Sequence, residues 1–100
     1  MPIYNAGMAN IRPFKGILPR LGARVYVDAA ATVIGDVLLG DDASIWPGAV
    51  ARGDVHHIRI GARSNIQDFV MLHIGVQPTI VGEDCSITHH CTIHGCRIGD

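Results

Sequence analysis

A repeat of six residues runs through most of this 100-residue chain and constrains its fold more than any other feature. Aliphatic residues recur every sixth position, and a small or β-branched residue usually stands four places after each. The aliphatic positions are Val27, Val33, Leu39, Ile45 and Ala51, then Ile60, Ile66 and Leu72, and finally Val81, Ile87 and Ile93. A fixed short period predicts a solenoid, in which neighbouring repeats stack on one another and bury a continuous core.

The repeat is interrupted twice, and both interruptions have the same length. Ala51 to Ile60 and Leu72 to Val81 are each nine residues, one hexad plus three. If three hexads make one coil, both insertions fall at the same corner, and this agreement supports the register. The resulting columns are Val27, Ile45, Ile66 and Ile87; Val33, Ala51, Leu72 and Ile93; and Leu39, Ile60 and Val81.

The composition agrees with a β-solenoid and excludes several other classes. The chain is 48% hydrophobic with few aromatic residues, so Val, Ile, Leu and Ala must build the core. No stretch holds a helical apolar stripe without a glycine or proline break. We therefore expect an all-β chain with a single domain over residues 1–100. Residues 1–24, rich in proline and glycine, are expected to form an irregular lead-in, and residues 25–100 the hexapeptide coils.

The charge and the N-terminal residues predict a cytoplasmic protein that binds neither nucleic acid nor membrane. The formal net charge is -1 with 17% charged residues, which creates no field of one sign. Residues 1–10 do not resemble a signal peptide, and no segment approaches the ~20 apolar residues of a membrane span. The three cysteines, an odd number, fit reduced thiols. Cys85 and Cys91 take the small inward position as apolar filler.

One column of outward positions carries candidate metal ligands. The residues directly after the inward Ala51, Leu72 and Ile93 are Arg52, His73 and His94. Stacked coils lie ~4.8 Å apart, so the two imidazoles can reach one tetrahedral metal bonded at ~2.0–2.1 Å. The register therefore predicts a site with two ligands from one chain.

A third ligand is normal for catalytic zinc, and His89 and His90 are the nearest candidates in sequence. Up to ~17 Å of extended chain separates His89 from His94, so one chain is not expected to bring both to one metal. A neighbouring subunit of a cyclic trimer could supply the missing ligand. The alternative is that these histidines are solvated or fill a subunit contact.

The ordered motifs of the chain resemble the γ-class carbonic anhydrases and their bacterial homologues over about residues 11–100. The resemblance is carried by Ser44-Ile45-Trp46, Arg52-Gly53-Asp54, Asn65-Ile66-Gln67-Asp68, Leu72-His73, His89 and Ile93-His94-Gly95-Cys96. It implies a left-handed parallel β-helix, assembled as a homotrimer. It also implies reversible hydration of carbon dioxide to bicarbonate, catalysed by a metal-bound hydroxide at a subunit interface. The implied metal ligands are His73, His89 and His94, which would bind Zn²⁺, with Fe²⁺ or Co²⁺ as alternatives.

The same resemblance implies roles for five further residues. Arg52 and Asp54 would form ion pairs near the interface, and a plain surface salt bridge is the alternative reading. Asp68 would join the Arg52 network. Gln67, together with Asn65, would position the bound water or bicarbonate.

The sequence departs from the family pattern in two respects. The family's acidic proton shuttle is not seen, because Val55 follows Asp54 and the insertion after His73 holds no glutamate. His56 and His57 could substitute as titrating groups, although adjacent exposed histidines are more often bystanders. The family's later coils and terminal helix are also not seen. A catalytically weak structural subunit that binds metal, and a hexapeptide-repeat acyltransferase, therefore stay open as alternatives.

Overall fold

The computed structural model describes residues 3–4 and 10–99, and every element in this part of the chain is a strand. No described residue belongs to a helix long and apolar enough to cross a membrane. The strands are β1 (Ile3–Tyr4), β2 (Asn10–Arg12), β3 (Arg20–Leu21), β4 (Val25–Val27), β5 (Thr32–Leu39), β6 (Ser44–Ile45), β7 (Val50–Ile60), β8 (Asn65–Ile66), β9 (Met71–His73), β10 (Thr79–Val81), β11 (Ser86–Ile87), β12 (Thr92–His94) and β13 (Arg97–Ile98).

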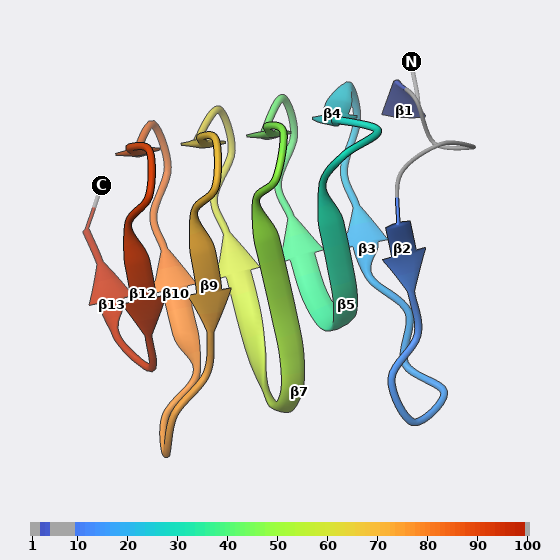
Figure 1. Cartoon of the computed structure of the whole chain (residues 1–100), viewed down its shortest axis with the longest axis vertical. Helices are drawn as coiled ribbons and strands as arrows, with labels where there is room; N and C mark the ends of the chain where they lie inside the picture. Colours follow the sequence, from blue (N-terminus) through green and yellow to red (C-terminus); the bar gives the residue numbers. More distant parts are fainter. Residues whose placement is uncertain (1–2, 5–9, 100) are drawn as a thin grey trace.

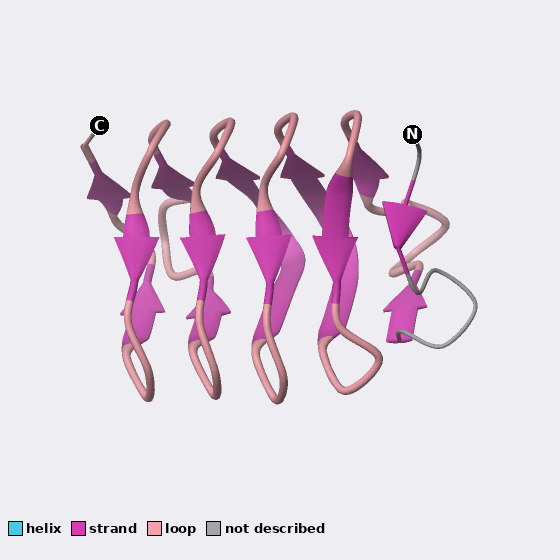
Figure 2. Cartoon of the chain, turned by 90° about the horizontal axis from the view of Figure 1, so that it is seen from above, coloured by secondary structure: helices cyan, strands magenta, loops and turns pink. Residues whose placement is uncertain are grey.

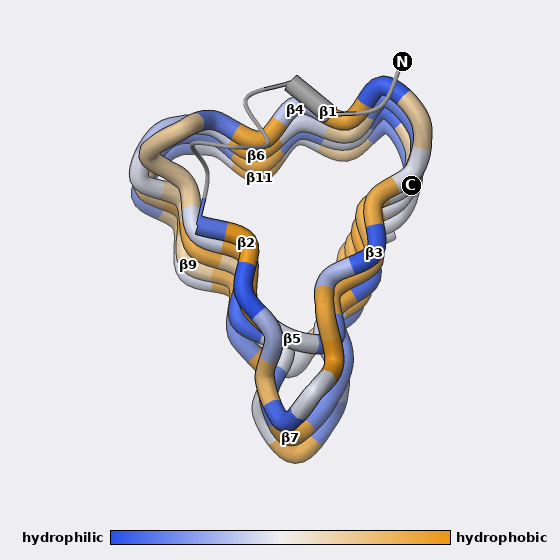
Figure 3. The backbone as a smooth tube through the Cα atoms, turned by 90° about the vertical axis from the view of Figure 1, so that its right-hand side faces the viewer, coloured by the Kyte–Doolittle hydropathy of each residue, from blue (hydrophilic) through white to orange (hydrophobic). Residues whose placement is uncertain are grey.

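The strands stack in parallel as a β-solenoid, as the hexad pattern predicts. Seen along its axis the backbone traces a triangle, and the coils superpose on one another (Figure 3). Side by side, strands of successive coils run in the same direction (Figures 1 and 2). One side is the sheet β1-β4-β6-β8-β11, and the other two sides share a second sheet in which β5 and β7 each turn a corner.

The predicted register is confirmed on all three sides. Val27, Ile45, Ile66 and Ile87 pair in sequence along the first column. The other columns pair in the same way, as Val33, Ala51, Leu72 and Ile93, and as Leu39, Ile60 and Val81. These side chains fill the axis of the triangle, where nearly all of them are buried, so period-six spacing builds one continuous core.

Both three-residue insertions lie at one corner, which we call the insertion corner: residues 13–19, 35–36, 53–57 and 75–78. The pairing of β5 with β7 runs from Gly35 opposite Gly53 to Val37 opposite Ile58, so the extra residues bulge outward and the register resumes. Gly35 has φ of +78°, and a side chain there would collide with the carbonyl oxygen of Gly53. Glycine is therefore required where the two coils turn this corner together.

The lead-in expected over residues 1–24 is wrong in part, because it contains three strands of the solenoid. Ile3 pairs with Val25, Ile11 with Val33, and Leu21 with Leu39, all in parallel. Pro13, Gly16 and Pro19 of this stretch fall in the loop between β2 and β3, at the insertion corner. Strand pairing with the next coil supplies the hydrogen bonds that local sequence preferences do not indicate.

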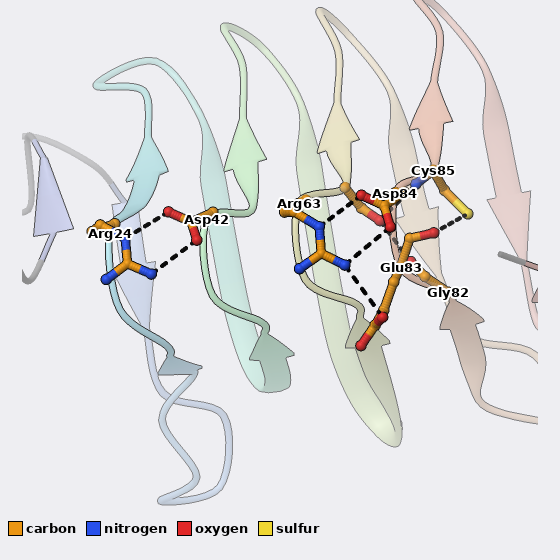
Figure 4. A network of polar contacts seen from close by, with 8 residues as sticks. Arg24, Asp42, Arg63, Gly82, Glu83, Asp84 and Cys85 are labelled. Carbon is orange, nitrogen blue, oxygen red and sulfur yellow. Dashed lines mark hydrogen bonds and ion pairs between the residues drawn. The ribbon is translucent and has the colours of Figure 1, made fainter.

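A second corner carries four charged residues of alternating sign, Arg24, Asp42, Arg63 and Asp84, which we call the charge ladder. Each has a positive φ, between 56° and 62°. Arg24 binds Asp42 at 2.7 Å and Arg63 binds Asp84 at 2.7 Å (Figure 4). These hydrogen bonds hold the pKa of Asp42 and of Asp84 below the ordinary range of an aspartate.

Candidate metal centre

His73 and His94 occupy matching positions on successive coils. His73 ends β9, His94 ends β12, and the two residues pair in register. Both side chains point outward, with ring centroids 5.6 Å apart and planes inclined by 33°. The stacking that the hexad register predicts is therefore present, and it presents two imidazoles together on one face of the solenoid.

Asp54, at the insertion corner, contacts the imidazole of His73. Nε2 of His73 lies 3.2 Å from Oδ2 of Asp54, and both side chains are largely buried. The same carboxylate oxygen lies 3.6 Å from Nε of Arg52, so the predicted ion pair between Arg52 and Asp54 is formed. With its proton on Nε2, a neutral His73 ring keeps the lone pair of Nδ1.

The environment of Asp54 keeps this carboxylate ionised. Burial alone raises its pKa, but the hydrogen bond from the Val55 amide at 2.8 Å, and the contact with His73, lower it. The net pKa of Asp54 is below its ordinary value. An ionised carboxylate that accepts a hydrogen bond from a ring nitrogen fixes the tautomer and the orientation of that ring.

A separate cavity of ≈ 370 Å³ opens beside the sheet of β6, β8 and β11. Gln67 donates from Nε2 to Oδ1 of Asn65 at 2.9 Å, and Asn65 donates from Nδ2 to Oγ of Ser86 at 3.1 Å. The two amides are thus held in fixed orientations. The residues that line the cavity are Ser44, Trp46, Asn65, Gln67, Asp68 and His89.

The structure distinguishes between His89 and His90. His89 lines the cavity, with its Nδ1 3.8 Å from Oδ1 of Asp68 and its side chain 62% exposed. His90 instead stacks on Phe69, with centroids 5.3 Å apart. Asp68 lies beside His89, in the turn between β8 and β9, whereas Arg52 pairs with Asp54, so the expected link of Asp68 to the Arg52 network stays a prediction.

Comparisons with known proteins agree on a family. No family model matches the chain. Protein YrdA of Escherichia coli K12 is 46% identical over 98 residues, covering 90% of this chain and 53% of YrdA. A probable carbonic anhydrase of Methanocaldococcus jannaschii is 47% identical over 81 residues, covering 80% of this chain and 51% of that protein. Mitochondrial gamma carbonic anhydrase 2 of Arabidopsis thaliana is 40% identical over 89 residues, covering 82% and 32%.

A solved structure of a similar protein has the same fold. The hexapeptide transferase family protein from Anaplasma phagocytophilum superposes with a TM-score of 0.84 at 39% identity, covering 88% of this chain and 52% of that one. The chain belongs to the γ-carbonic anhydrase/YrdA-like family of hexapeptide-repeat proteins. It spans about half the length of YrdA and of the Methanocaldococcus protein, and about a third of the Arabidopsis protein.

This member of the γ-carbonic anhydrase/YrdA-like family holds its candidate metal ligands in two separate places. Within the described part of one chain, no three histidine, cysteine or carboxylate side chains come close enough to hold a metal ion. His73 and His94 form a two-imidazole half, and their spacing fits a shared metal. His89 lies in the separate cavity, so a site built from all three histidines would need more than one chain.

Sequence reasoning missed two features of these sites. Trp46 forms a wall of the cavity beside Ser44, to which its indole N–H donates at 2.9 Å. Its place directly after the inward Ile45 is an outward position, and this signal was present in the register. Thr79 is a buried polar residue in an inward column, and only the hydrogen bonds of the folded chain show what it binds.

Proposed function

We propose that this chain is a metal-dependent, carbonic anhydrase-like protein that converts carbon dioxide and water reversibly to bicarbonate at a subunit interface. The observation that carries the proposal is the stacked pair of His73 and His94, oriented by the ionised Asp54. Family relatives named carbonic anhydrase support the choice of reaction.

The proposed ligands are His73 and His94 of one subunit and His89 of the next. A homotrimer with cyclic symmetry would repeat such an interfacial site three times. Zn²⁺ is the proposed metal, with Fe²⁺ or Co²⁺ as alternatives, because ligand type alone does not choose between them. When bound by three histidines, such a metal lowers the pKa of a coordinated water to ~7 and so supplies a nucleophile at neutral pH.

The remaining residues would orient a metal ligand and bind water or bicarbonate. Asp54 holds the His73 ring in place through Nε2, and Arg52 balances the charge of that carboxylate. Because the amide of Gln67 donates to Asn65, its Oε1 is left to accept a hydrogen bond from water or bicarbonate in the cavity. Trp46 would exclude bulk water from one wall.

A second candidate is a metal-binding subunit with slow turnover. The observation that favours it is at the insertion corner, where Val55 directly follows Asp54 and Val76 lies in the loop after His73, both as exposed apolar side chains. Val55 is 72% exposed and Val76 is 92% exposed, and neither can carry a proton. His56 and His57 are then the titrating groups nearest in sequence to Asp54.

Metal content, oligomeric mass and the rate of carbon dioxide hydration test these proposals together. We expect a trimer with about one metal ion per chain and stopped-flow hydration well above background for zinc protein or anaerobic iron(II) protein. Full metal occupancy with background hydration would leave only the structural role. Trimers that bind no metal would refute the site itself.

A further inference from the structure

Thr79 is a buried hydroxyl in a column that is otherwise aliphatic. It begins β10 and pairs in register with Ile58, which itself pairs with Val37. All three side chains are fully buried. Burial of a hydroxyl in such a position is unfavourable unless it is hydrogen-bonded, so the partners of Thr79 indicate why a polar residue is placed there.

The hydroxyl of Thr79 joins the two candidate ligand strands. It donates to the backbone carbonyl of His73 at 2.5 Å and accepts from the backbone N–H of Gly95 at 2.9 Å. Gly95 directly follows His94, and its N–H also lies 3.2 Å from the His73 carbonyl. One side chain thus bridges the backbone of His73 to the residue next to His94.

The backbone around this bridge leaves little room to adjust. Gly95 has a φ of +58°, and a Cβ there would lie 2.8 Å from the backbone nitrogen of Gly75. Gly75 in turn donates to the carbonyl of Gln77 at 3.1 Å, which closes the loop leading to Thr79. The chain segments after His73 and after His94 are therefore in close contact, with Thr79 between them.

We infer that Thr79 is a positioning residue for the His73–His94 pair, an inference that rests on the proposed metal site. The direction of an imidazole follows from the backbone that carries it, and metal sites tolerate little displacement of their ligands. By linking the two coils where both histidines leave the sheet, the hydroxyl sets the spacing of the two rings. Thr79 acts on the ligands without itself touching the metal.

Three variants separate this role from a general contribution to folding. Thr79→Val removes the hydroxyl and keeps the shape, and the valine and isoleucine of the same column show that the core accepts it. Thr79→Ser keeps the hydroxyl. Ser64→Ala is the matched control, because buried Ser64 also donates to a carbonyl, of Gly82, and accepts from an amide, of Cys85, far from the histidines.

Three measurements compare these variants with wild type. They are the Co²⁺ affinity, the visible spectrum of the Co²⁺ protein and the nuclear Overhauser contact between the two histidine rings. We expect Thr79→Val to weaken Co²⁺ binding about 10-fold to 100-fold, change the spectrum and lose the ring contact. Thr79→Ser should restore all three, and Ser64→Ala should leave them at wild-type values.

The outcomes distinguish this inference from the proposed function. Thr79→Val protein with wild-type ring contact and Co²⁺ affinity would overturn the positioning role, as would equal losses in Ser64→Ala. Wild-type protein that binds no Co²⁺ would overturn the proposed function, while the ring contact measured without metal would still decide whether Thr79 positions the two histidines.

Discussion

The carboxylate of Asp54 accepts a hydrogen bond from Nε2 of His73 across 3.2 Å, although 19 positions separate the two residues in the chain. The contact joins the insertion corner to the stacked histidines. It places a charged, oriented group behind one proposed ligand, where a partner of a metal-binding imidazole is expected.

Asp54→Asn should weaken metal binding without unfolding the protein. The amide keeps the shape of the carboxylate but loses its charge, and we expect a decrease in Zn²⁺ affinity of about 10-fold to 100-fold, measured by competition with a chelator. Asp28→Asn is the control, since Asp28 accepts from the hydroxyl of Tyr26 at 2.6 Å and has no contact with a proposed ligand. Equal losses in both variants would argue against a specific role for Asp54.

Mixed oligomers test whether the ligands come from different subunits. His73→Ala and His89→Ala should each bind almost no metal when expressed alone. In co-expressed trimers, a His89→Ala subunit still offers His73 and His94 to a neighbour with an intact His89, so we expect part of the metal content to return. His90→Ala should bind like wild type. No recovery in mixed trimers would contradict the shared site.

The charge ladder should make stability depend on acid pH. The pKa values of Asp42 and Asp84 are lowered in the folded chain, so their contribution is present above the unfolded value of 3.8. This contribution to stability is lost as the pH falls below 3.8 and passes through the lowered pKa values of the two aspartates in the folded chain. Urea unfolding should therefore show a flatter acid dependence for Asp42→Asn/Asp84→Asn than for wild type. Because the pairs are exposed, 1 M salt should reduce the difference.

Removing a buried side chain from the core should lower the free energy of unfolding far more than replacing an exposed side chain at the insertion corner. Ile66 is fully buried in the middle of its column, and Ile66→Ala should lower the free energy of unfolding by about 2–5 kcal/mol. Val76 is 92% exposed, and Val76→Ala should change stability by less than about 0.5 kcal/mol. Urea denaturation measures both, and similar values would contradict the core assigned here.

The coil register could be predicted from sequence because aliphatic residues repeat every six positions, a spacing that stacked coils satisfy. Val33, Ala51 and Leu72 pair as that spacing requires, and the stack of His73 on His94 follows from it. The first coil was missed because Ile11 and Leu21 are ten residues apart with prolines between them, which hides the period. Strand pairing with the next coil compensates for these breaks.

Contacts made by single side chains could not be predicted in the same way. The register places Asp54 at the insertion corner but does not show that its carboxylate reaches His73. Thr79 interrupts an aliphatic column, which signals an unusual role, yet its partners are backbone atoms that any sequence would provide. Hydrogen-bond geometry of this kind exists only once the coils are stacked.

The insertion corner absorbs differences in coil length without disturbing the stacked columns. Tyr26 and Ser44 are paired eighteen positions apart, whereas Ser44 and Asn65 are paired at twenty-one, yet the columns stay aligned. Exposed positions of these loops, such as Val55 and Val76, can therefore change while the histidines keep their spacing along the axis. Under the proposed function, substitutions at such positions could alter proton transfer, provided that Asp54 and the loop closed by Gly75, which hold the histidines, are kept.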